Sequence, residues 1–227
     1  MKMLDKIKQH ALDCAPKESC GLIVIVKGRK RYVPCRNIAP TGHFAIAPED
    51  YVAAEELGVL HAVVHSHVNQ SAKPSEADLI NCEKSGLKWM IVSVPSMEVH
   101  EFEPSGYELP LYGRKFDHGT VDCYSFIRDY YKQELDIELL DFDRADNWWH
   151  GGENLYLDNF GKAGFVEVSD LQPHDVILMK IGSSVPNHGA IYLGNGKIGH
   201  HQQNRLSSVD MYGGYFQKAT AKILRYQ

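Results

Sequence analysis

Two histidines separated by one residue, His65 and His67, follow an apolar run and precede Ser75 and Asp78. Side chains on a strand alternate between its two faces, so residues i and i+2 point to the same side. Both imidazoles can therefore reach one metal ion, and Asp78, in the first turn of an expected helix, can supply an oxygen ligand. Two histidines and one carboxylate, with the fourth position left to water, are typical of catalytic zinc. The spacing therefore predicts a zinc ion that activates water at neutral pH.

A hydrolytic site of this kind also needs a general base, and Glu18, just before the apolar run Cys20–Val26, is the candidate. Ser75-Glu76-Ala77-Asp78 is at the same time a capping box, in which the first and fourth residues close the start of a helix. This structural interpretation is compatible with the metal site, because a cap that fixes Asp78 also orients it as a ligand.

Taken as a set, the residues of this candidate site match a known signature. Glu18 before Cys20-Gly21, then His65-Ser66-His67, and after seven residues Ser75 and Asp78, resemble the JAMM metallopeptidase signature at every position. The resemblance implies an α/β domain of cytidine-deaminase-like fold that cleaves isopeptide or peptide bonds. It also implies Glu18 as general base and Ser75 as a stabiliser of the oxyanion, with zinc held by His65, His67 and Asp78. Some members of this family lack activity, so zinc binding is the firmer expectation.

The second candidate for chemistry is Cys123, which follows Asp122 at the start of an expected helix. The dipole and the free N–H groups of a helix N-terminus favour a thiolate, so we expect a lowered pKa for this cysteine. A nucleophile of this kind needs a base and a group that orients the base. His188 and the pair His200-His201 can supply both.

The turn Gly194-Asn195-Gly196 decides which of the two adjacent histidines faces His188. A two-residue turn, Asn195-Gly196, pairs Gly194 with Lys197 and places His201 on the face of His188. A three-residue loop with Gly196 left-handed shifts the register by one residue and places His200 beside His188. The residue types permit both arrangements.

The second set of residues also resembles a known family. Asp122-Cys123-Tyr124-Ser125-Phe126 is similar to the nucleophile motif of NlpC-type cysteine peptidases, and the run from His188 to Gly196 is similar to their histidine strand. The resemblance implies a papain-like α+β domain. It also implies Cys123 as nucleophile, His188 as base and His200 as the residue that holds the tautomer of His188, which favours the three-residue loop.

Three positions depart from the pattern of this second family. Tyr124-Ser125 replaces the commoner Ser-Gly, and His174 replaces glycine in a segment, Leu171–Val176, that otherwise resembles the family's Leu-x-Pro-Gly-Asp-Leu. The family also has an active-site tyrosine upstream of the cysteine, for which Tyr112 is the nearest candidate. These departures concern the substrate pocket more than the cysteine and histidine.

Apolar periodicity predicts the elements that position the first site. We expect a helix over Met1–Cys14, strands at Cys20–Val26, Leu60–His65 and Trp89–Val94, and helices from Pro48 to Leu57 and from Ser75 to Cys82. Strands that alternate with helices indicate a compact α/β domain.

A Pro- and Gly-marked stretch, residues 104–110, is the expected linker, so we predict domains at 1–104 and 105–227. After it we expect a helix at Asp122–Lys132, loops and short helices over 141–164, and strands at Val176–Lys180, Gly189–Leu193, Lys197–His201 and Lys222–Tyr226. A helix followed by strands indicates an α+β domain.

Composition excludes several classes of function. The 227 residues include 24 Lys+Arg and 29 Asp+Glu, and the net charge of −5 argues against nucleic acid as a partner. We expect no transmembrane segment and no Sec-type signal, because the apolar runs are too short and the first residues are charged. The five cysteines, an odd number without a CxxC pair, indicate reduced thiols.

A JAMM domain followed directly by an NlpC-type domain resembles the tail assembly proteins of lambda-like long-tailed phages over essentially the whole chain. The resemblance implies a tail-tip protein with a zinc-dependent peptidase and a cysteine endopeptidase that hydrolyses peptidoglycan stem peptides. The implied partners are other tail tip proteins and peptidoglycan, and the implied location is the virion after synthesis in the host cytoplasm. The alternative is a structural or assembly component whose peptidase folds act as docking modules.

Overall fold

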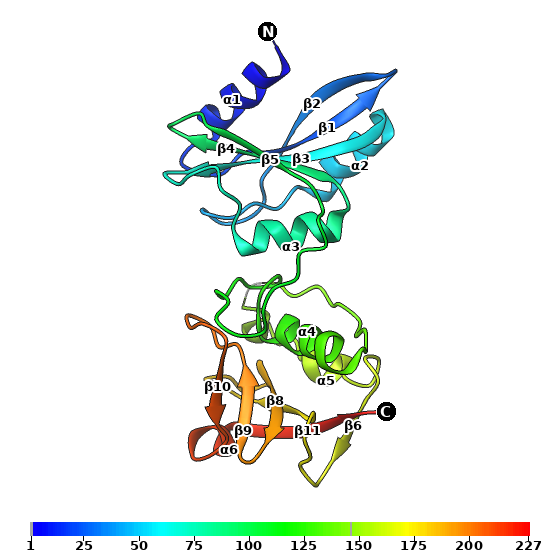
Figure 1. Cartoon of the computed structure of the whole chain (residues 1–227), viewed down its shortest axis with the longest axis vertical. Helices are drawn as coiled ribbons and strands as arrows, with labels where there is room; N and C mark the ends of the chain where they lie inside the picture. The colour runs from blue at the N-terminus through cyan, green and yellow to red at the C-terminus, as the bar shows by residue number, and fades with distance from the viewer. Residues whose placement is uncertain (1, 146) are drawn as a thin grey trace. The chain divides into compact units, whose positions relative to one another are not determined.

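The chain folds around two separate β-sheets, one of five and one of six strands (Figure 1). The computed structural model describes residues 2–145 and 147–227. They divide into two units, Met1–Glu108 and Leu109–Gln227. Met1, at which the expected N-terminal helix begins, and Asp146, in the expected loop region, lie outside the described residues. In the part of the chain that is described, no helix is long and apolar enough to cross a bilayer.

The sheet of the first unit has the strand order β2-β1-β3-β4-β5, and only the pair β3 and β4 is parallel. The strands predicted from apolar runs form its buried centre. The edge strands β2 and β5 were not predicted, because β2 exposes a run of basic side chains and β5 is short. The bounds are β1 (Cys20–Val26), β2 (Arg29–Cys35), β3 (Val59–Val68), β4 (Lys88–Val94) and β5 (Val99–Phe102).

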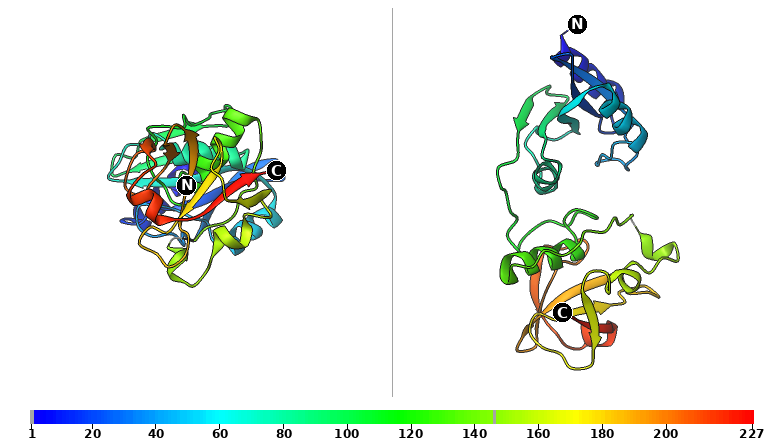
Figure 2. Two further views of the ribbon diagram at one scale, coloured as in Figure 1. Left: turned by 90° about the horizontal axis from the view of Figure 1, so that it is seen from below. Right: turned by 90° about the vertical axis from the view of Figure 1, so that its right-hand side faces the viewer.

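Helices cover both faces of this sheet (Figure 1, Figure 2). They are α1 (Met3–Cys14), α2 (Pro48–Leu57) and α3 (Glu76–Ser85), and all three were predicted within a few residues. Ile7 of α1 packs with Ile23 of β1 in one core, whereas Ala54 of α2 and Cys82 of α3 pack with Leu22 in another. Because Leu22 and Ile23 are neighbours on one strand, the two cores lie on opposite faces. The predicted α/β class is confirmed.

The sheet of the second unit has the order β10-β9-β8-β7-β11-β6. Neighbouring strands pair antiparallel throughout. The strands are β6 (Phe165–Val168), β7 (Val176–Met179), β8 (His188–Gly194), β9 (Lys197–His200), β10 (Ser208–Met211) and β11 (Thr220–Tyr226). Four of the six were predicted, and the two that were missed, β6 and β10, are partly exposed and each have an acidic residue in place of a continuous apolar run.

One long helix, α4 (Cys123–Leu135), packs against β8 and β9 (Figure 1). Phe126 and Ile127 of α4 share a core with Val176 and Ile191, while Ile177 packs on the other face with Phe216 of α6 (Tyr215–Ala219). The 3₁₀-helix η1 (Trp148–His150) and α5 (Leu155–Asn159) lie in the region expected to hold loops and short helices. This arrangement confirms the α+β class of the second unit.

The segment that follows β5 is held by the first unit. The carboxylate of Glu83, on α3, accepts hydrogen bonds from the backbone N–H groups of Ser105 (2.7 Å), Gly106 (3.2 Å) and Tyr107 (3.0 Å). These bonds hold the pKa of Glu83 below its usual range. The division between the units therefore falls after Glu108, four residues beyond the predicted boundary.

Candidate metal centre and candidate cysteine site

Strand β3 and the first turn of α3 bring together the three residues predicted as metal ligands. Nε2 of His65 lies 3.2 Å from Nε2 of His67, and the two oxygens of Asp78 lie 3.2 Å from His65 Nε2 and 3.3 Å from His67 Nε2. Two atoms bound tetrahedrally to one zinc ion at ordinary Zn–N lengths are about 3.3 Å apart. All three side chains are buried, and their spacing fits a single zinc ion.

Neighbouring groups fix the orientation of both imidazoles. Nδ1 of His67 donates to the carbonyl of Ser71 (2.9 Å), which fixes the ring with Nε2 facing Asp78. Nδ1 of His65 has no hydrogen-bond partner among the described residues, and aromatic rings hold this side chain instead. Phe44 stacks on His65 at 4.3 Å between ring centroids, and Trp89 meets it edge-on at 5.5 Å.

The capping box at the start of α3 is present as the sequence predicts. The Ser75 hydroxyl accepts from the N–H of Asp78 (3.1 Å) and donates to its carboxylate (2.7 Å), while the N–H of Ser75 donates to the same oxygen (2.7 Å). Although burial alone would raise it, the hydrogen bonds from His65 and His67 hold the pKa of Asp78 well below its usual range. The Ser75 hydroxyl is thus committed to Asp78, and it would have to turn to serve as the predicted oxyanion donor.

Glu18 lies beside His67 because β1 and β3 pair in a defined register. Cys20 is opposite His65, and beyond this pair the N–H of Ser66 donates to the carbonyl of Ser19 (3.0 Å) while the N–H of Ser19 donates to the Ser66 hydroxyl (2.8 Å). Glu18 as a residue is only 6% exposed. Burial raises its pKa to about 7, with Asp78 adding to the rise and His67 opposing it. A carboxyl group that titrates near neutrality is suited to general base and acid catalysis.

Sequence reasoning missed the loop between β2 and α2, which contributes Phe44 to this site. Asn37 organises the loop: its amide donates to the carbonyls of Glu18 and His43 (2.9 Å each), and its oxygen accepts from Ala39 and Ala45. The loop lacks apolar periodicity and matches no motif, so the sequence holds no signal for its part in the site.

The second site is built at the N-terminus of α4, where Asp122 is the cap. Its Oδ1 accepts from the N–H groups of Tyr124 (3.0 Å) and Ser125 (2.9 Å), and its Oδ2 accepts from the N–H of Gly119 and from Nε of Arg144 (2.9 Å each). Both members of this ion pair are buried. The pair ties the start of α4, and with it Cys123, to the segment before η1.

Substitution of Asp122 by alanine is expected to lower the free energy of unfolding of the second unit by about 3–5 kcal/mol. The loss exceeds the roughly 1 kcal/mol typical of a helix cap, because Arg144 would remain buried without its partner. Urea titration of the full chain, followed by Trp148 and Trp149 fluorescence, measures it.

Asp122→Asn keeps a capping oxygen and should lose less stability than the alanine variant, so equal losses would contradict the argument. Burial opposes ionisation of Asp122, but Arg144 and the N–H donors hold its pKa below the usual range. This stabilisation is therefore present above the unfolded pKa of about 3.9, and it is lost as the pH falls through the lower folded value.

The thiol of Cys123 is not the activated thiolate that its place on the helix leads us to expect. Burial of the sulfur raises the pKa of Cys123 to about 11, and the charge of Asp122 adds to this rise. Hydrogen bonds from Tyr156 and from the backbone of Gly189 oppose it without reversing it. The effect of the helix N-terminus is outweighed by burial of the sulfur, to which the carboxylate that caps the helix adds.

Alkylation of Cys123 by iodoacetamide is accordingly expected to accelerate about tenfold per pH unit from pH 7 to pH 10. The thiolate is the reactive form, and its fraction keeps rising until the pH reaches the raised pKa. Mass spectrometry of the peptide that contains Cys123 measures the rate, with a free cysteine peptide as the control. A rate that is flat above pH 7 would mean that the thiolate already predominates.

The hairpin of β8 and β9 combines the two alternatives for its turn. Gly194 pairs with Lys197 across a two-residue turn, so the predicted three-residue loop is wrong. A β-bulge between Tyr192 and Gly194 then shifts the register by one residue, and Ala190 lies opposite His200. A three-residue loop would have produced the same register. Here the register results from one extra residue in β8, at the bulge.

This register brings His188 and His200 together. Nε2 of His188 lies 2.9 Å from Nδ1 of His200, and both rings are buried. Burial lowers the pKa of His188 to about 3, so its imidazole is neutral at neutral pH. His201 is also buried, with its ring edge-on to Phe116, and it has no hydrogen bond to His188 in the described structure.

Sequence reasoning also missed Tyr156, which contacts the sulfur of Cys123. The hydroxyl of Tyr156 and Sγ of Cys123 share a hydrogen bond of 3.1 Å, whereas none joins Sγ to His188 within the described residues. Tyr112, the nearest candidate for the upstream tyrosine of the family, packs against Phe126, with 5.7 Å between ring centroids. Tyr156 lies 33 positions after the cysteine in a region without periodicity, so its only sequence signal is the local abundance of aromatic residues.

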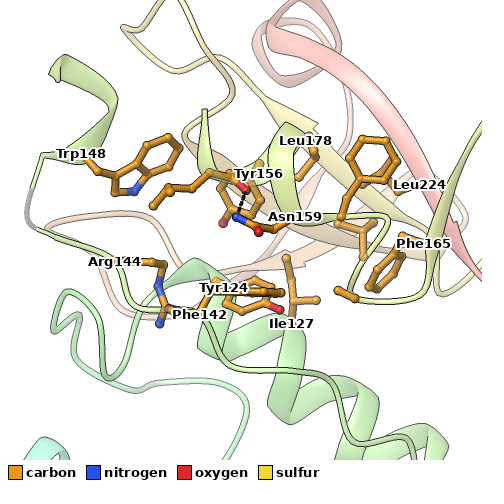
Figure 3. A pocket seen from close by; sticks show the side chains of 14 residues that line it. Tyr124, Ile127, Phe142, Arg144, Trp148, Tyr156, Asn159, Phe165, Leu178 and Leu224 are labelled. Atoms are coloured by element: carbon orange, nitrogen blue, oxygen red, sulfur yellow. Dashed lines mark hydrogen bonds between the residues drawn. The ribbon is translucent and has the colours of Figure 1, made fainter. Parts of the chain in front are cut away.

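The ring of Tyr156 lines an apolar pocket between α4, α5 and the sheet (Figure 3). Fourteen side chains surround this pocket, and most of them are aromatic or aliphatic, including Tyr124, Ile127, Trp148 and Leu178. Arg144 is its one charged lining residue, and its charge is neutralised by Asp122. Tyr156 therefore contacts the sulfur of Cys123 with its hydroxyl and lines the apolar pocket with its ring.

His174, which stands where the NlpC-type pattern has glycine, adopts a left-handed backbone with φ of 76°. The hydroxyl of Tyr131 donates to its carbonyl (2.7 Å), and the hydroxyl of Tyr130 lies 2.8 Å from its Nδ1. Two tyrosines of α4 thus hold a conformation that glycine adopts more readily.

Comparison with known families divides the chain into the same two parts. The model of the prokaryotic homologs of the JAB domain matches residues 1–104, and the model of the NlpC/P60 family matches residues 113–225. Among solved structures, a JAB1/MPN domain protein from Archaeoglobus fulgidus covers 48% of this chain and 90% of its own, with 22% identity and a TM-score of 0.31.

Two curated relatives match most or all of the chain. The tail tip assembly protein K of Escherichia phage N15 is 38% identical over 100% of this chain and 95% of its own length. The tail tip assembly protein K of Escherichia phage lambda is 41% identical over 80% of this chain and 89% of its own. Identity at this level over both domains shows common descent, and the chain belongs to the tail tip assembly protein K family, with an N-terminal JAB-type domain and a C-terminal NlpC/P60-type domain.

Proposed function

We propose that this protein is a tail tip component with two peptidase domains, a zinc-dependent JAMM peptidase at residues 1–104 and a cysteine endopeptidase at residues 105–227. The proposed substrate of the second domain is the peptide stem of peptidoglycan. The observation that carries the proposal is the hydrogen-bonded pair His188 and His200 in the NlpC/P60-type domain, whose cysteine begins α4.

In the second domain, Cys123 is the nucleophile and His188 the base. The thiol and the imidazole are both neutral before substrate binds, because the pKa of Cys123 is raised to about 11 and that of His188 lowered to about 3. Proton transfer therefore accompanies attack: Sγ bonds to the scissile carbonyl carbon while its proton passes to His188. His188 then protonates the leaving amine, and water releases the acyl group from Cys123.

In the first domain, His65, His67 and Asp78 would hold the zinc ion, which when bound supplies Lewis-acid polarisation and an activated water. Glu18 takes up a proton from the attacking water and returns it to the leaving nitrogen, a role that suits a pKa of about 7. Phe44, stacked on His65, and Trp89, edge-on to it, exclude solvent from one side of the site and keep the imidazole ring in place.

The names of the relatives favour a second role, in assembly. Both are called tail tip assembly proteins, so we infer that the virion tail is the location of this chain and that other tail tip proteins are its partners. In the alternative to the enzyme, the two peptidase folds act mainly as docking modules.

Digestion of purified peptidoglycan separates the enzyme from the docking module. The wild-type chain is expected to release new amino groups, Cys123→Ala to release none, and His65→Ala to release them at nearly the wild-type rate. Equal release of amino groups by the wild type and Cys123→Ala would rule out Cys123 as the nucleophile. No release by the wild type would reject this substrate and leave assembly as the better account.

A further inference from the structure

The pair of buried histidines continues into a third polar group that no motif indicates. Nε2 of His200 lies 2.9 Å from Oδ2 of Asp210, on the edge strand β10. Register places this carboxylate, because Ser208 of β10 is opposite His200 and Asp210 is opposite Ile198. His188, His200 and Asp210 thus form one continuous row of hydrogen bonds.

The carboxylate at the end of this row determines which nitrogens carry protons. A carboxylate only accepts hydrogen bonds, so Nε2 of His200 must be the protonated nitrogen. Burial lowers the pKa of His200, so the ring is neutral and its Nδ1 carries a lone pair. That lone pair can only accept, and therefore Nε2 of His188, 2.9 Å away, must donate. Nδ1 of His188 is then left unprotonated.

We propose that Asp210 is a positioning residue that fixes the tautomers of both histidines and so keeps Nδ1 of His188 free to accept the thiol proton. The inference rests on the proposed function of Cys123 and His188, and it adds a fourth member to their site. Once His188 is charged, the same row stabilises it: His188 donates to His200, and His200 donates to Asp210. No proton needs to move along the row.

Among the residues that the structure describes, the carboxylate of Asp210 is the one hydrogen-bond acceptor found for Nε2 of His200. From α6, the ring of Phe216 meets His200 edge-on, with 5.1 Å between ring centroids. From the loop before β10, Nη1 of Arg205 lies 3.5 Å from Oδ2 of Asp210. A guanidinium only donates, so Arg205 cannot replace the carboxylate. Without Asp210, nothing on these elements would favour one tautomer of His200.

Nitrogen-15 NMR of the histidine-labelled full chain tests the proposal directly. In the wild type we expect His188 and His200, assigned with the variants His188→Gln and His200→Gln, each to have a protonated Nε2 and an unprotonated Nδ1. Asp210→Ala should populate the other tautomer of both rings, whereas Asp210→Glu should restore the wild-type pattern. Asp170→Ala is the matched control, since this aspartate of the same unit pairs with Arg225.

In the peptidoglycan assay, Asp210→Ala should lower kcat about 10- to 100-fold with KM unchanged, because the wrong tautomer removes the base and not the binding site. A wild-type His188 protonated on Nδ1, or an unchanged tautomer of both rings in Asp210→Ala, would overturn the proposal. The NMR result does not depend on turnover. An inactive wild type with the expected tautomers would therefore reject the substrate and not the role of Asp210.

Discussion

Alanine at Cys123 or at His188 is expected to lower the rate of amino-group release from peptidoglycan by about 10⁴-fold or more. Cys123 supplies the bonding atom and His188 takes its proton, so neither residue can complete the first step without the other. Because the pKa of the thiol is raised and that of the imidazole lowered, no thiolate is formed in advance, and Cys123 has no base to deprotonate it when His188 is missing.

The double variant Cys123→Ala/His188→Ala is the sharper measurement. Residues that act as a unit are strongly non-additive, so the double variant should be no slower than either single variant. Cys14→Ala, which removes a half-buried thiol from α1 in the first unit, is the control for loss of a cysteine. Independent losses that multiply in the double variant would show that the two side chains do not share a step.

Asparagine at Asp78 is expected to reduce bound zinc from about one ion per chain to a small fraction, with affinity lowered by more than about 100-fold. Replacing a residue in the outer shell of a zinc site commonly costs 10- to 100-fold, and Asp78 lies within 3.3 Å of both candidate nitrogen ligands. Mass spectrometry with inductively coupled plasma on the untreated protein measures the metal content.

Glu76→Gln is the matched control, since it removes an acid from the same first turn of α3 that is not one of the three candidate ligands. Zinc should also raise the free energy of unfolding of the first unit, by about 2.7 kcal/mol at a hundred times Kd, and Asp78→Asn should abolish this gain. A wild-type chain with far less than one zinc ion, or an Asp78→Asn chain with an unchanged content, would contradict the metal assignment.

The first unit could be predicted well because its signals are local. Buried strands such as Cys20–Val26 are continuous apolar runs, and the spacing from His65 to Asp78 spans one strand and one cap. Phe44 was beyond prediction, because its place on His65 depends on a loop that a single side chain, Asn37, bonds to the backbone of Glu18, just before β1.

The second unit could be predicted in outline only. Its nucleophile and its histidines stand in recognisable motifs, but the face that each histidine takes depends on a one-residue bulge near Leu193, which no residue type announces. Tyr156 and Asp210 reach the site through tertiary contacts, from a short helix and a four-residue edge strand. The pKa of Cys123 was misjudged for a similar reason, since burial depends on what the rest of the chain packs against the sulfur.

The hydrogen bonds that Ser105, Gly106 and Tyr107 donate to Glu83 have a practical consequence for separating the two domains. A chain that ends at Pro104 would lack the three N–H donors, so the carboxylate of Glu83 would be left to water and the nearby end of β5 would fray. A chain that ends at Glu108 keeps all three hydrogen bonds. Limited proteolysis should likewise spare residues 105–107 and cut first on their C-terminal side. The end of the first unit is therefore better chosen from the hydrogen bonds of Glu83 than from the prolines that mark the linker.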